Sequence, residues 1–189
     1  MPNPCTRGIA AQAALEHVDA YRKGAGARVL ARVPADSLAA IAACPGTDWI
    51  DVEHERWVTH SIFAELGDDA VEYFRWMVAR RLIDTPLLRP IVERTTRMFG
   101  ITPGTYLRFA PLAFGLMFRD FCTLRVAERG QHHGTVELID CHAEVFANPD
   151  YIRSWQGALG STFDLAHVQG EVSYEVDDRA RTIGYLLRW

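Results

Sequence analysis

The sequence predicts an α+β fold in which an N-terminal helical part, about residues 8–118, precedes a four-stranded antiparallel sheet, about residues 121–189. In the first part apolar residues recur every three or four positions, which indicates amphipathic helices. In the second part the spacing changes to two, which indicates strands arranged as a β-hairpin, a helix and a second β-hairpin. No repeat or low-complexity segment marks a linker, so we expect residues 1–189 to form a single domain.

The first helices are predicted to be short, because glycine and proline interrupt the apolar pattern. A helix over residues 8–21 is followed by two shorter helical segments, the second of which Pro45 closes. A longer helical hairpin is predicted over residues 52–82, where Gly67 ends one helix and Asp68 caps the next.

Two further helices are predicted to begin at Thr-Pro pairs, Thr85 with Pro86 and Thr102 with Pro103. Threonine suits the cap, and proline suits the first helical position because its missing N–H would have no partner there. The second of these helices, residues 103–118, has apolar residues on all sides. This pattern predicts a helix that is buried all round.

The register of both hairpins follows from placing apolar residues on one face of the sheet. The predicted pairs are Leu124 with Leu138, Arg125 with Glu137, Val126 with Val136, Glu171 with Arg188, Val172 with Leu187, Tyr174 with Tyr185 and Val176 with Ile183. Between the hairpins, Asn148 and Pro149 begin a helix with a continuous apolar stripe. We expect that helix to cover the sheet.

Composition and charge exclude several classes of protein. A net charge of −4 supplies no long-range attraction for nucleic acid, so no nucleic-acid binding is expected. The most apolar stretch, residues 109–118, is shorter than the roughly 20 residues that cross a bilayer, so no membrane span is expected. The N-terminal residues lack the pattern of a signal peptide, and the four cysteines form no Cys-x-x-Cys pair. These features favour a reducing, cytoplasmic location.

No catalytic residue and no metal site are predicted. His54 and His60 are six residues apart, whereas two histidines that bind zinc from one helix face are four apart. The sequence contains neither a Gly-x-Ser-x-Gly elbow nor a phosphate-binding loop. Cys122 and Cys141 are expected on opposite faces of the first hairpin, which disfavours a disulfide between them. Enzymatic activity is therefore not expected, although the sequence leaves it open.

A ligand pocket is predicted beside the apolar helix over residues 103–118. Phenylalanine, methionine and tyrosine commonly line apolar pockets, and we expect this pocket between that helix and the sheet. Plain core packing is the alternative that the sequence leaves open. The candidate ligand-binding residues are Tyr106, Phe109, Phe114, Met117, Phe118 and Trp155.

Several short segments carry a resemblance to known proteins. They are Arg7 with Gly8, residues 14–16, Gly24, Trp49, residues 99–103 and residues 187–189. These segments are similar to an uncharacterised myxobacterial paralogous family. The order of elements over nearly the whole chain resembles the heme-nitric-oxide-binding superfamily, which also includes 4-vinyl-reductase-like sensor domains and a vesicle-tethering (TRAPP) subunit.

The resemblance implies a sensor fold whose heme-binding members carry a histidine ligand on the helix before the sheet and a Tyr-x-Ser-x-Arg motif. Residues 103–118 contain no histidine, and residues 135–139 read Thr-Val-Glu-Leu-Ile. No cofactor is therefore predicted, heme of the family type included. The 4-vinyl-reductase-like relatives hold zinc with a cysteine in the last strand, which this chain lacks.

Together these features predict a non-enzymatic sensory or regulatory domain that binds an apolar small molecule, such as an acyl chain or lipid. The alternative is a protein–protein interaction or homodimerisation module without a ligand. An exposed apolar patch near Trp57 and Trp76 would favour that alternative.

Overall fold

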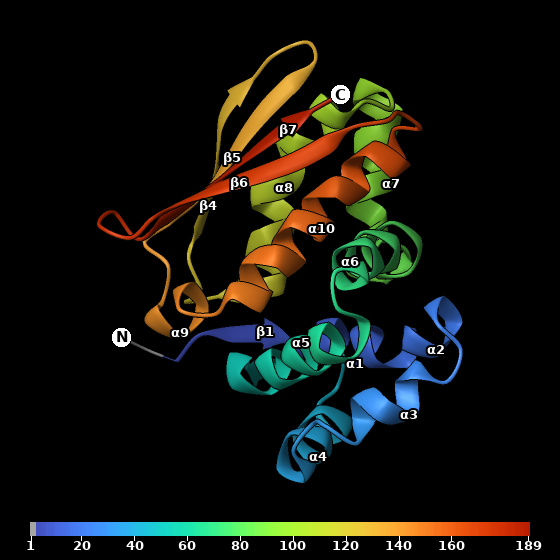
Figure 1. Cartoon of the computed structure of the whole chain (residues 1–189). Helices are drawn as coiled ribbons and strands as arrows, with labels where there is room; N and C mark the ends of the chain where they lie inside the picture. The colour runs from blue at the N-terminus through green and yellow to red at the C-terminus, as the bar shows by residue number, and fades with distance from the viewer. Residues whose placement is uncertain (1–2) are drawn as a thin grey trace.

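The computed structural model describes residues 3–189 and confirms the predicted α+β fold (Figure 1). The helices are α1 (Gly8–Glu16), α2 (Val18–Tyr21), α3 (Ala25–Leu30), α4 (Ala35–Ala43), α5 (Val52–Leu66), α6 (Asp69–Arg80), the 3₁₀ helix η1 (Leu82–Asp84), α7 (Arg89–Phe99), α8 (Pro103–Met117), α9 (Ala143–Phe146) and α10 (Pro149–Leu165). The strands are β1 (Cys5–Arg7), β2 (Trp49–Asp51), β3 (Phe118–Arg119), β4 (Thr123–Arg129), β5 (His133–Ile139), β6 (Glu171–Asp177) and β7 (Thr182–Arg188).

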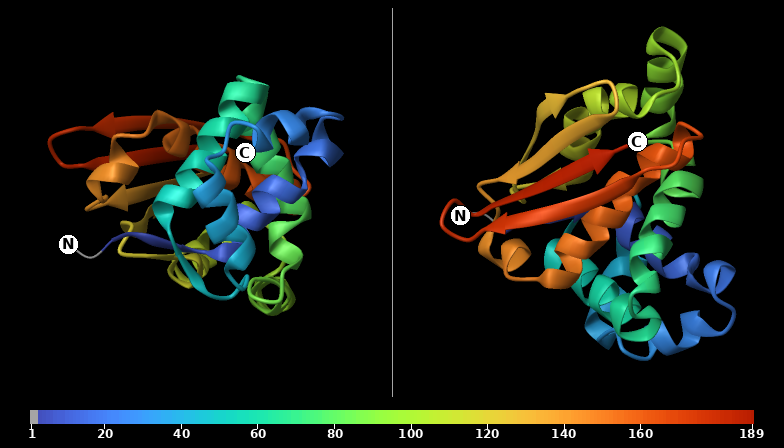
Figure 2. Two further views of the ribbon diagram at one scale, coloured as in Figure 1. Left: turned by 90° about the horizontal axis from the view of Figure 1, so that it is seen from below. Right: turned by 45° about the horizontal axis from the view of Figure 1, so that its top comes forward.

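The larger sheet is antiparallel with the strand order β4-β5-β7-β6, and both predicted hairpin registers are confirmed. Val126 pairs with Val136 in the first hairpin, and Tyr174 pairs with Tyr185 in the second. The hairpins join through β5 and β7, where Val136 lies opposite Tyr185. One face of the sheet packs against α8 and α10, so the helix predicted to cover the sheet does so (Figure 2).

A second, smaller sheet with the order β2-β1-β3 was not predicted. Its central strand pairs Thr6 with Ile50 on one side and with Phe118 on the other. Each strand has only two or three residues, which is too short for an alternating pattern to appear in the sequence. This sheet brings the start of the chain against α5 and α8.

Two large groups of buried side chains make up most of the core. The first lies among the N-terminal helices and includes Val29, Ile62 and Tyr73. The second lies between the larger sheet and helices α8 and α10, and it includes Leu107 and Phe163. Helix α10 stands between these groups, since it contacts both α6 and the sheet (Figure 1).

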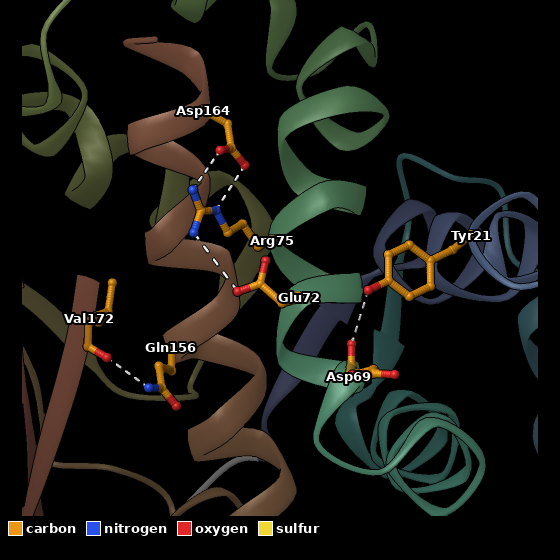
Figure 3. A network of polar contacts seen from close by, with 7 residues as sticks. All are labelled: Tyr21, Asp69, Glu72, Arg75, Gln156, Asp164 and Val172. Carbon is orange, nitrogen blue, oxygen red and sulfur yellow. Dashed lines mark hydrogen bonds and ion pairs between the residues drawn. The ribbon is translucent and has the colours of Figure 1, made fainter. Parts of the chain in front are cut away.

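A chain of polar contacts holds α10 to its neighbours (Figure 3). From α6, Arg75 donates two hydrogen bonds to Asp164 of α10, at 2.9 and 2.6 Å. From α10, the Gln156 amide donates to the Val172 carbonyl oxygen of β6 at 2.7 Å. Helix α10 is therefore fastened on one side to the helical part and on the other to the sheet.

The helix predicted to begin at Thr85 and Pro86 starts later, at Arg89. The Thr85 hydroxyl donates back to the Leu82 carbonyl oxygen at 2.7 Å and so does not cap a helix. Residues 85–88 form a turn, and Pro90 occupies the first helical turn of α7. The prediction for Thr102 and Pro103 is confirmed, because the Thr102 side chain caps α8.

Helix α8 is not buried all round, so that prediction is wrong. Arg108, Leu112 and Gly115 lie on an exposed face, and Leu112 is 55% exposed. Leu107, Phe114 and Met117 lie on the buried face. An apolar residue on the outer face of a helix cannot be distinguished from a core residue by its type alone.

The prediction that Cys122 and Cys141 lie on opposite faces is also wrong. Cys141 is part of the buried group between the larger sheet and helices α8 and α10, Cys122 packs against that same group, and both cysteines are free. The last paired residues of this hairpin are Thr123 and Ile139, and Asp140 then has a φ of 53°. This left-handed residue ends the extended chain, so the alternation of faces does not continue to Cys141.

Candidate functional site

A cavity of about 200 Å³ lies among helices α6, α7, α8 and α10. Its wall is almost entirely apolar, with side chains such as Met77 from α6, Ile91 from α7 and Leu159 from α10. The 3₁₀ helix η1 and the following turn close one side through Leu82 and Leu88. These four helices supply most of the wall, and Ala10 and Ala14 of α1 and Glu55 of α5 add to it.

All six candidate residues lie on the wall of this cavity. They are Tyr106, Phe109, Phe114, Met117, Phe118 and Trp155. The opposite wall is different from the one expected, because it consists of helices α6, α7 and α10. The larger sheet contributes only Leu124, since buried side chains such as Leu107 and Phe163 fill the space between α8 and the sheet. The predicted position of the pocket is therefore wrong.

Three aromatic side chains form one section of the wall. The ring centroids of Phe114 and Phe118 are 5.0 Å apart, and those of Phe114 and Trp155 are 5.2 Å apart. The Phe118 and Trp155 rings are also 5.0 Å apart. Behind them, Phe121 packs edge-on against the Tyr151 ring at 5.6 Å. These contacts fix the aromatic section against the core.

A carboxyl group interrupts the apolar wall. Glu55 of α5 lines the cavity, and the Tyr151 hydroxyl donates a hydrogen bond to its Oε2 at 3.0 Å. Protein atoms enclose the carboxyl, although the residue keeps some accessible surface. Burial raises the pKa of Glu55 from 4.5 to about 7, and the hydrogen bond from Tyr151 offsets part of that rise. The nearby Thr6 hydroxyl also lowers this pKa, although this buried hydroxyl has no hydrogen-bond partner among the described residues.

Four other polar side chains on the wall donate hydrogen bonds within the protein. On α10 the hydroxyls of Ser154, Ser161 and Thr162 donate to carbonyl oxygens of the same helix, at 2.8, 2.5 and 2.8 Å. The Tyr106 hydroxyl donates to the Leu165 carbonyl oxygen at 3.4 Å and so bridges α8 and α10. Burial raises the pKa of Tyr106, so it is neutral near pH 7.

Glu55 and Tyr151 were not among the residues predicted from the sequence. One signal was present, because Glu55 lies on the same helix face as Val52, Thr59 and Ile62, all of which are buried. A lone carboxyl on an otherwise buried stripe is unusual. Its partner could not be found in this way, since Tyr151 lies 96 residues further along the chain.

Neither metal-binding clusters nor membrane helices occur among residues 3–189. No group of three or more His, Cys, Asp or Glu side chains gathers there in a way that could hold a metal ion. No helix in this part of the chain is both long and apolar enough to cross a membrane. His54 lies near Ser37 at 3.0 Å, and His60 near Asp150 at 2.8 Å.

Comparison with known proteins identifies similar structures only. No family model and no curated protein sequence matches the chain. Among solved structures, the chain is similar to the Fe(II) unliganded H-NOX protein from K. algicida, with a TM-score of 0.62 and 9% identity over 96% of this chain and 95% of the other. An oxygen-binding H-NOX domain related to soluble guanylate cyclases matches with a TM-score of 0.56 and 10% identity, covering 96% and 93%. A single-residue mutant of the T. Tengcongensis H-NOX matches with a TM-score of 0.57 and 10% identity, covering 96% of each chain.

The prediction that this chain has no cofactor, heme of the family type included, is contradicted by these matching structures. Three of the matching structures are described in terms of heme redox potential, Fe(II) and heme distortion. The cavity wall here offers no histidine or cysteine among the described residues, and no arginine or lysine to pair with heme propionates. Side chains of a type that can bind heme iron are Met77, Met117, Tyr106 and Tyr151. The wall therefore does not fit a histidine-ligated heme.

The myxobacterial, 4-vinyl-reductase-like and vesicle-tethering likenesses stay predictions. What the matching structures establish, at 9–10% identity, is that this chain has the fold of H-NOX domains.

Proposed function

We propose that the chain is a non-enzymatic sensory or regulatory domain that binds a mostly apolar small molecule in the cavity among α6, α7, α8 and α10. The observation that carries this proposal is an apolar hollow of about 200 Å³ within an H-NOX-type fold. Such hollows are few in a protein, because interiors are packed as densely as organic crystals.

The volume of the cavity indicates the size of its ligand. An engineered apolar cavity of about 150 Å³ binds benzene or xenon. A space of about 200 Å³ thus accepts a single ring with a short substituent, or a short acyl chain. A larger molecule, such as a long lipid or the heme named for the matching structures, would need the helices around the cavity to move apart.

A binding experiment with matched variants tests this proposal. The protein is purified, its visible spectrum is recorded, and co-purified molecules are extracted for mass spectrometry. Hemin and 2-phenylethanol are then titrated separately, and the fluorescence of Trp155 reports binding. Ala113→Phe fills the cavity and should weaken 2-phenylethanol binding about tenfold or more. Leu112→Phe, on the exposed face of α8, is the matched control and should leave it unchanged.

The outcomes of this experiment distinguish a heme ligand, an empty cavity and a ligand bound elsewhere. A Soret band in the purified protein, or after hemin addition, would identify heme as the occupant. If neither probe binds and nothing co-purifies, the cavity is only a packing defect and the proposed function is wrong. If both variants bind 2-phenylethanol equally well, the ligand lies elsewhere.

A second candidate function is a protein-interaction or homodimerisation module. Three large apolar side chains are exposed at the corner between α7 and α8, namely Met98, Phe99 and Ile101, and Leu112 is exposed further along α8. This surface is not the apolar patch near Trp57 and Trp76 that the sequence analysis considered. Those two tryptophans are half-buried against the helical core. Sedimentation over a range of concentrations tests this candidate, since Ile101→Glu should abolish any dimer that forms through the corner.

A further inference from the structure

Glu55 is a feature of the cavity that a purely apolar ligand would leave unexplained. Its carboxyl group receives one hydrogen bond, from Tyr151, and makes no ion pair within the described residues. Buried carboxyls are ordinarily paired with a positive charge or a full set of hydrogen bonds. Here no positive charge among the described residues pairs with the carboxyl, and Glu55 lines the cavity.

The surroundings of Glu55 show which groups influence its charge. Tyr151 faces it from α10 and Thr6 approaches it from β1. Asp51 and Arg56 act on the Tyr151 hydroxyl from a distance. Burial and the neighbouring carboxyl raise the pKa of Tyr151 well above its usual value, so the phenol stays neutral and serves as a donor. Glu55 is therefore the group in this cluster that changes charge near pH 7.

The aromatic section of the wall adds a second observation. Phe114, Phe118 and Trp155 line the same cavity and lie in mutual contact. The face of an aromatic ring carries partial negative charge and attracts cations, and groups of such rings bind ammonium groups in other proteins. Phe121 connects these rings to Tyr151, so the carboxyl and the rings belong to one continuous cluster.

We propose that the cavity recognises a ligand with one basic nitrogen, an amine or a nitrogen heterocycle, on a compact apolar body. The nitrogen lies against the Glu55 carboxylate, and the body packs on Phe114, Phe118 and Trp155. An amide or hydroxyl at position 55 could accept a hydrogen bond from a neutral ligand equally well, but only a carboxylate gains strongly from a positive charge in an apolar enclosure. This inference rests on the proposed function, because it concerns the ligand of the same cavity.

Three probes that differ only in their polar end test the inference. They are 2-phenylethylamine, 2-phenylethanol and phenylacetate, titrated at pH 8 with Trp155 fluorescence as the readout. The protein should bind the amine about tenfold more tightly than the alcohol, and phenylacetate should bind most weakly because two carboxylates repel each other. Glu55→Gln, which keeps the shape and the acceptor for Tyr151, should remove the preference for the amine, so that this variant binds the amine and the alcohol with affinities within about twofold of each other.

The pH dependence in the unmutated protein gives an independent measure, which holds even if Glu55→Gln fails to fold. The amine is protonated throughout, so its advantage over the alcohol should increase between pH 5.5 and pH 8 as Glu55 loses its proton. If the alcohol binds but the amine binds no more tightly at any pH, this inference is wrong while the proposed function stands. If none of the three probes binds, the proposed function fails first.

Discussion

Helix α10 meets two of its helical neighbours, α6 and α8, in different ways. Against α6 the backbones approach closely, because a Cβ atom at Gly157 would collide with the Val71 carbonyl oxygen and lie 3.1 Å from the Phe74 Cβ. Against α8 the helices are held apart by large side chains, among them Phe114 and Trp155, and the cavity lies between them. The first contact is closed and the second is open.

The difference shows how one helix can serve both stability and binding. A contact through glycine excludes water and leaves no room for a ligand. A contact through aromatic side chains leaves spaces, because flat rings of fixed shape do not fill every gap between two helices. The closed contact also carries the Arg75 and Asp164 pair (Figure 3), whereas Glu55 of α5, which lines the cavity beside the open contact, makes no ion pair among the described residues.

The largest effect is expected where the closed contact is forced open. Gly157→Ala places a methyl group against backbone atoms of α6, which cannot rotate away as a side chain could. We expect a loss of about 3 kcal/mol or more in the free energy of unfolding, measured by urea denaturation. A loss below about 1 kcal/mol would show that α6 and α10 separate easily.

The next largest effect is expected at Glu55, which lines the cavity beside the open contact. The pKa of Glu55 is raised from 4.5 to about 7 in the folded protein, so its contribution to stability is fully present below pH 4.5 and is lost as the pH rises through 7. Glu55→Gln cannot ionise and avoids this loss. We expect the variant to be about 2 kcal/mol more stable than the parent protein at pH 8 and nearly equal at pH 4.5. Chemical denaturation at the two pH values measures the difference, and equal stability at both would contradict the raised pKa.

The ion pair of the closed contact should have a smaller effect. Arg75 and Asp164 are partly buried and joined by two hydrogen bonds. A double-mutant cycle with alanine at both positions should give a coupling free energy of about 1 kcal/mol. The exposed pair of Arg89 and Glu93 is the matched reference and should give a smaller coupling free energy, because water screens an exposed ion pair. Similar values for both pairs would mean that partial burial adds nothing.

The smallest effect is expected at a glycine that no close contact requires. A Cβ atom at Gly115 of α8 would meet no atom within 4 Å. Gly115→Ala should therefore stabilise the protein by about 0.5 kcal/mol through helix propensity. Thermal unfolding of Gly115→Ala and Gly157→Ala, measured side by side, separates the general effect of alanine in a helix from the collision with α6. If Gly115→Ala also lowers the stability, the loss at Gly157 cannot be assigned to that collision.

Much of the larger sheet could be predicted because its information is local. The pairs Val126 with Val136 and Tyr174 with Tyr185 lie around short turns, so alternation and charge complementarity were enough to set the register. The starts of α8 and α10 could be predicted for the same reason, because the side chains of Thr102 and Asn148 cap these helices through hydrogen bonds to residues two or three positions away. The short strands β1, β2 and β3 could not be found, because two or three residues carry no period.

The candidate site also has features that the sequence predicts and features that it does not. The residue types of α8 by themselves pointed to Tyr106, Phe109 and Phe114, and these side chains do line the cavity. Which wall faces them was decided only by the packing of α10 between α6 and the sheet, a contact that joins residues as much as 89 positions apart in the chain. The meeting of Glu55 with Tyr151 was likewise decided only in the tertiary structure. The sequence determines local periods, caps and turns, whereas the position and charge of a cavity depend on which distant surfaces pack against each other.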